Sequence, residues 1–153
     1  MSVDAMLQEI VDFDRRHRVL REKFNYFHAR CLELTAKAQP HTDRPLIPAT
    51  VGALEPTGMF TVAFAGAELR IRFAYEPGGE HGAKGIVRCE RMEVTTGKPI
   101  GLAPQFEYSL SGTTGVHFPG NGPLAQIDSA EGTVVLFAVL LRDGLMSAGN
   151  DGP

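Results

Sequence analysis

Residues 4–38 read DAMLQEIVDFDRRHRVLREKFNYFHARCLELTAKA, and this stretch decides the fold. It contains no glycine and no proline, so no residue in it interrupts a helix. Ten mostly apolar residues recur in it at alternating spacings of four and three, which places them on one stripe of a helix. These residues are Met6, Ile10, Phe13, His17, Leu20, Phe24, Phe27, Cys31, Leu34 and Ala38. The sequence therefore predicts a long amphipathic helix within residues 1–39, capped by Ser2 or Asp4 and ended by Pro40.

The predicted helix is too long for a globule of 153 residues. It would extend ~52 Å at about 1.5 Å per residue, whereas the globule would be roughly 38 Å across. We therefore expect a neighbour to cover the overhang, as in an antiparallel or sheet-swapped homodimer. The alternative is that the apolar stripe docks on the chain's own sheet. The expected interface residues are Phe13, Arg16, Leu20, Lys23, Phe24, Phe27 and Arg30.

The charges beside the stripe argue against a parallel zipper. When Ile10 is taken as position a of a heptad, Glu9 and Arg16 occupy g positions, and Asp14 and Arg21 occupy e positions. A parallel homodimer would oppose Glu9 to Asp14 and Arg16 to Arg21, and both pairs are like-charged. Five basic residues also lie within residues 15–23. They form either a solvated flank or a surface that steers an acidic protein partner or a second subunit.

Composition changes sharply near residue 40. All 17 glycines lie in residues 52–152, and nine of the ten prolines follow Pro40. We interpret residues 40–49 as a Pro-rich linker, residues 50–146 as an antiparallel β domain packed with the helix, and residues 147–153 as a flexible tail. The predicted fold class is α+β, with a mainly antiparallel sheet arranged as a meander or a sandwich.

Short apolar runs in the second half predict individual strands. Residues 58–65 and 67–76 read as a hairpin that turns at Gly66, because apolar residues alternate with polar ones in the second run. Residues 85–96 are polar on both faces, which favours an edge strand. Residues 106–110 predict a further short strand.

The last apolar run, within residues 133–146, is ambiguous. Asp128 and Glu131 have the spacing of a helix capping box. Against a helix, Gly132 would sit in the first turn, and four β-branched residues follow it within the run. We predict a central strand that forms a hairpin with residues 124–127.

The Gly-rich loop 111–123 is the main candidate for a ligand site. It offers the His117 imidazole, the Asn121 amide and the Thr114 hydroxyl, although a plain connection between strands is the simpler interpretation. No phosphate-binding loop, nucleophile elbow or zinc-binding pattern is present. We therefore assign no catalytic residue, no metal and no cofactor.

Composition narrows the class of function. A net charge of −3 argues against a nucleic-acid coat, no apolar run is long enough to cross a membrane, and two cysteines fit a reduced, cytoplasmic protein. We predict a non-enzymatic, self-associating protein that uses the helix as its interface. The alternatives are a small-ligand domain using loop 111–123, or an enzyme built around Cys89, Glu90 or Glu107.

Overall fold

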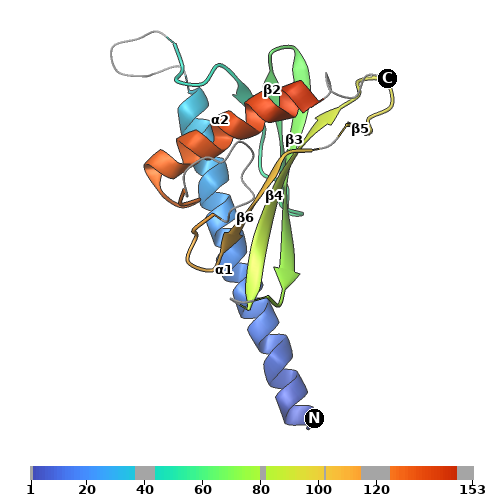
Figure 1. Ribbon diagram of the computed structural model, residues 1–153, viewed down its shortest axis with the longest axis vertical. Helices are drawn as coiled ribbons and strands as arrows, with labels where there is room; N and C mark the ends of the chain where they lie inside the picture. The colour runs from blue at the N-terminus through green and yellow to red at the C-terminus, as the bar shows by residue number, and fades with distance from the viewer. Residues whose placement is uncertain (1, 37–43, 80–81, 102, 115–124, 148–153) are drawn as a thin grey trace.

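A computed structural model describes residues 2–36, 44–79, 82–101, 103–114 and 125–147 (Figure 1). The two helices are α1 (Val3–Thr35) and α2 (Ala130–Ser147). The strands are β1 (Thr50–Val51), β2 (Met59–Phe64), β3 (Ala67–Pro77), β4 (Ala83–Met92), β5 (Pro99–Ile100) and β6 (Gln105–Ser109). The predicted α+β class, with a long N-terminal helix followed by an antiparallel sheet, is confirmed.

The six strands form a single antiparallel sheet rather than a sandwich. Its order is β1-β2-β3-β4-β5, and β6 pairs with β4 beside β5. The predicted hairpin is β2–β3, and its turn passes through Ala65 and Gly66 at positive φ. The strand predicted at residues 106–110 is β6. Both helices pack on one face of the sheet (Figure 1). The other face carries charged side chains, among them Arg72 and Glu90.

The edge-strand prediction for residues 85–96 is wrong, because β4 lies inside the sheet. It pairs with β3 on one side and with β5 and β6 on the other. Its inner face carries Val87 and Cys89, both fully buried. Its outer face carries Glu90, which forms an ion pair with Arg72 on β3. The mixed polarity therefore marks a central strand with one charged face.

The strand prediction for residues 133–146 is also wrong, because these residues belong to helix α2. Ser129 caps the helix, since its Oγ accepts a hydrogen bond from the Gly132 amide at 2.9 Å. Gly132 is required there because a Cβ would lie 2.0 Å from the carbonyl oxygen of Gln126. The inward face of α2 fills the core, which overrides the strand preference of the β-branched residues. This face includes Leu136, Phe137, Leu140 and Leu141, all buried.

Helix α1 is continuous, as predicted, and Ser2 caps it by accepting a hydrogen bond from the Ala5 amide at 3.1 Å. It ends at Thr35, five residues before the proline expected to stop it. From Leu20 onward its apolar stripe enters the core, and the Tyr108 hydroxyl donates to the Leu20 carbonyl oxygen. Neither described helix is long and apolar enough to cross a membrane.

The segments flanking the globule are described only in part. Within the predicted linker 40–49, Ile47 is buried and its amide donates to the Leu34 carbonyl oxygen at 3.0 Å. Residues 37–43 and the predicted tail beyond Ser147 lie outside the described residues.

Candidate functional site

The N-terminal part of α1 extends past the end of the sheet (Figure 1). We call residues 3–17 the free half of α1. We call the end of the free half that adjoins the sheet its root. The root is fixed where the His17 ring packs against the rings of Phe73 and Tyr75, with centroid distances of 5.8 and 5.5 Å. Beside it, the Arg16 guanidinium lies against Gly82 at the turn between β3 and β4. On the N-terminal side of this contact, α1 does not pack on the chain's own sheet.

Apolar side chains gather on the free half although nothing in the described structure covers them. Six of them are between 36% and 66% exposed. In contrast, Leu20, one turn beyond the root, is fully buried. Soluble monomers rarely leave a large apolar surface open to solvent, so the free half is the candidate interaction site. The six residues are Val3, Met6, Leu7, Ile10, Val11 and Phe13.

Charge is separated along the same helix. Residues 4–14 hold four acidic residues and no basic one, whereas residues 15–23 hold five basic residues and a single acidic one, Glu22. Two ion pairs cross the boundary, Asp12–Arg15 at 3.5 Å and Asp14–Arg18 at 3.1 Å. Three of the four side chains are about two-thirds exposed and that of Asp12 is 30% exposed, so these pairs stabilise the helix by only about 0.3–0.5 kcal/mol each. The helix surface is therefore acidic toward its N-terminus and basic toward its root.

The structure divides the predicted interface residues into three groups. Phe13 and Arg16 lie on the free half. Leu20, Phe24 and Phe27 are fully buried in the chain's own core, so their assignment to an interface between chains is corrected. The helical repeat is the same in both parts of α1, and only the position of the sheet decides which side chains it covers.

The remaining two predicted interface residues form ion pairs within the chain. Lys23 Nζ lies 2.8 Å from a carboxylate oxygen of Asp128, just before α2. Arg30 Nη1 lies 2.7 Å from a carboxylate oxygen of Glu33, on the next turn of α1. Both contacts lie well beyond the free half: the first joins α1 to the segment before α2, and the second stays within α1.

The predicted ligand loop is only partly described, since His117 and Asn121 lie outside the described residues. Thr114 is 2% exposed and has a structural role. Its amide donates to the Ala125 carbonyl oxygen, and its hydroxyl accepts from the Ala125 amide, both at 2.9 Å. Thr114 therefore closes the loop and does not offer its hydroxyl to a ligand.

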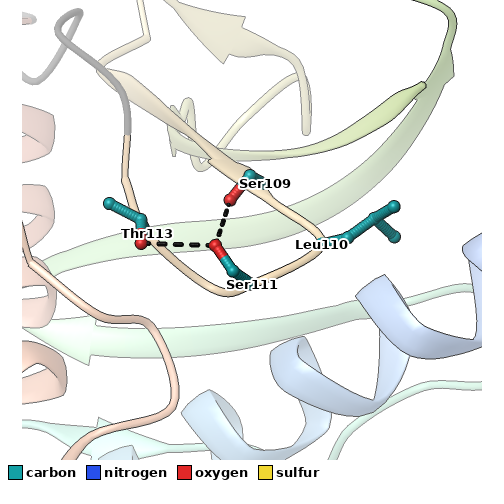
Figure 2. Close-up of a pocket in the computed structure, with 4 residues that line it drawn as sticks. All are labelled: Ser109, Leu110, Ser111 and Thr113. Atoms are coloured by element: carbon teal, nitrogen blue, oxygen red, sulfur yellow. Dashed lines mark hydrogen bonds between the residues drawn. The ribbon is translucent and has the colours of Figure 1, made fainter. Parts of the chain in front are cut away.

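A row of hydroxyl groups lines an open hollow of about 500 Å³ beside this loop (Figure 2). Ser109 Oγ lies 2.7 Å from Ser111 Oγ, which lies 3.3 Å from Thr113 Oγ1. Gln126 donates to the same Thr113 oxygen at 2.7 Å, while Leu110 points away from the row (Figure 2). No charged side chain lines the described part of the hollow. The hydroxyls bond to one another, and the described lining of the hollow includes no carboxylate, imidazole or amine that could act as a catalytic acid or base.

The residues considered for catalysis do not converge. Cys89 faces the core, whereas Glu90 and Glu107 lie on the outer face of the sheet, where Glu107 accepts from Lys84 Nζ at 3.0 Å. Burial, with a smaller contribution from the Glu90 charge, raises the pKa of Cys89 to about 12. Burial likewise raises the pKa of Cys31 well above its usual value. Neither thiol is an active nucleophile at neutral pH. Among the described residues, no group of three or more His, Cys, Asp or Glu side chains is placed to hold a metal ion.

Both thiols should be inert in the folded chain. We expect no rapid reaction of Cys31 or Cys89 with a thiol reagent at pH 8, and reaction of both after denaturation. Because the folded pKa of Cys89 lies above the usual 9.0, the stability it contributes is present below pH 9 and is lost as the pH rises toward 12. Denaturant titrations at pH 8 and pH 11 test this, with Cys89→Ala as the control that lacks the Cys89 contribution. Rapid labelling of the folded chain would contradict the buried placement.

No protein-family model, no curated protein and no solved structure matches this chain. The function of the chain therefore has to be inferred from its own geometry. The most distinctive feature of that geometry is the free half of α1.

Proposed function

We propose that this chain is a non-enzymatic, self-associating protein in which the free half of α1 binds the free half of a second copy. One observation carries the proposal: an unbroken helix leaves its sheet while its apolar side chains continue, uncovered, toward the N-terminus. The hydroxyl-lined hollow and the buried thiols provide no comparable support for ligand binding or catalysis. We place the chain in the cytoplasm, where two unpaired cysteines stay reduced.

The composition of the free half favours a helical partner over a membrane surface. Its exposed apolar residues are flanked by Asp4, Glu9, Asp12 and Asp14, which anionic lipid would repel. A second amphipathic helix can cover the apolar stripe while these carboxylates stay in water. The contact spans only about four turns, so we expect a reversible dimer at the small end of specific interfaces.

Ile10→Glu tests this interface because it places a charge on the continued stripe. Ile10 is 61% exposed in the single chain, so the fold should tolerate the substitution. In a dimer, two unpaired carboxylates would be buried, and we expect the dissociation constant of the dimer to rise about 100-fold or more. Sedimentation velocity over a range of concentrations measures the effect.

Gln8→Glu is the matched control for this experiment. Gln8 is exposed and lies about 160° from Ile10 round the helix, on the face opposite the stripe. We expect the dissociation constant of this variant's dimer to rise less than about threefold above that of the wild type, because exposed charges contribute little. Equal loss of association in both variants would argue against the stripe, and a wild-type chain that stays monomeric would exclude the proposal.

A further inference from the structure

We infer that the two copies pair antiparallel, so that the acidic turns of each free half lie beside the basic turns of the other. This inference rests on the proposed self-association and identifies the occupant of the free half as a second copy of this chain. The separated charges of α1 carry it: residues 4–14 are acidic, residues 15–23 are basic, and reversing one helix against another brings the two zones together.

The register follows from the stripe. In an antiparallel helix pair, a positions of one helix pack against d positions of the other. Ile10 then lies opposite Phe13 of the second copy, and Met6 opposite His17 of the second copy. These two layers and their symmetry mates span residues 6–17, about 18 Å of helix. The overlap reaches the His17 contact with Tyr75, and residues 3–5 of each copy lie beside residues 18–20 of the other, where the other copy's sheet begins.

The flanking residues make this register electrostatically favourable. Glu9 of one copy lies beside Arg16 of the other, and symmetry produces this contact twice. On the other flank, Leu7 lies beside Asp14 of the second copy, with no like charges opposed. A parallel pair would instead oppose Glu9 to Asp14 and Arg16 to Arg21. Charge therefore selects the antiparallel form.

The single chain leaves both members of the proposed contact available. In the part of the chain that the structure describes, no ion pair involves Glu9 or Arg16. Glu9 is exposed, and Arg16 is half-buried against Gly82, which holds its guanidinium at the root of the free half. A second copy arriving antiparallel brings its Glu9 to this position.

Charge reversal distinguishes the two orientations. In the antiparallel pair, Glu9→Arg opposes two arginines and Arg16→Glu opposes two glutamates, so each variant alone should self-associate about 10-fold more weakly. Mixing the two variants should restore association to within about threefold of the wild type, because both contacts between positions 9 and 16 then join opposite charges. In a parallel pair, each substitution would instead create an attractive contact and tighten the dimer.

Sedimentation velocity of the wild type, the two variants and their equimolar mixture separates the outcomes. Circular dichroism checks that the variants remain folded, and Glu9→Arg is informative on its own because Glu9 lies far from the sheet. Weakening by each variant with rescue on mixing supports the inference. A wild-type dimer that charge reversal leaves unchanged or tightens overturns the antiparallel pairing but not self-association. A monomeric wild type overturns both.

Discussion

Replacement of Phe27 by alanine is expected to lower the free energy of unfolding by about 3–5 kcal/mol. Phe27 is fully buried where both helices meet the sheet. Its ring lies 6.0–6.5 Å from those of Phe24 on α1, Phe60 on β2, Phe106 on β6 and Phe137 on α2. Truncation would open a cavity against all of them, and the rigid elements could close it only in part.

Denaturant unfolding monitored by circular dichroism measures this loss, at a concentration where the chain is monomeric. Tyr26→Ala is the control, because Tyr26 precedes Phe27 on the same helix and is 41% exposed. We expect it to cost less than about 1 kcal/mol, as surface substitutions usually do. If Phe27→Ala cost no more than this control, the proposed centre of the core would be wrong.

The second large effect is expected from Gly85→Ala on β4. A Cβ at this position would lie 2.4 Å from Cζ of Tyr108, which crosses the glycine from the neighbouring strand. The ring cannot move aside without breaking its hydrogen bond to the Leu20 carbonyl oxygen on α1. We expect a loss of about 1–3 kcal/mol from overpacking, and more if the hydrogen bond is lost as well.

A double-mutant cycle with Tyr108→Leu tests the cause of this loss. Removing the ring should relieve the overlap, so the double variant should lose less stability than the two single variants added together. Additive losses would mean that Gly85 is needed for its backbone and not for the space it leaves to Tyr108. The same denaturant titrations provide all three values.

The long helix and the β2–β3 hairpin were predictable because their signals are local. A 35-residue stretch without glycine or proline, and an alternating strand next to a Gly66 turn, each have few alternatives. The two wrong predictions concern elements that tertiary contacts define. Strand β4 looks like an edge because its outward Glu90 pairs with Arg72 across the sheet, and this pairing does not show in the sequence.

Helix α2 was missed because local preference and tertiary packing disagree. Its β-branched residues favour a strand, and Gly132 discourages a helical first turn. The structure requires that glycine, because only the absence of a Cβ lets the turn approach the Gln126 carbonyl oxygen. The Asp128–Glu131 spacing did indicate a helix start, but the cap is Ser129, the residue after Asp128.

The candidate site could be predicted only in part for a similar reason. The stripe repeats from Met6 to Leu34 without a change in character, so its periodicity cannot tell where the sheet begins to cover it. The structure puts that boundary between Phe13, which is 36% exposed, and Leu20, which is fully buried. Three predicted interface residues fall on the buried side of it, whereas the other five exposed apolar residues of the free half were not among the predicted interface residues.

Sedimentation equilibrium of the wild-type chain tests the central claim most directly, because it determines mass without regard to shape. Self-association through the free half predicts a mass that rises with concentration toward twice the 16.6 kDa of the single chain. The Ile10→Glu chain should stay near the single mass under the same conditions. A wild-type mass of 16.6 kDa at every concentration up to the millimolar range would contradict the account.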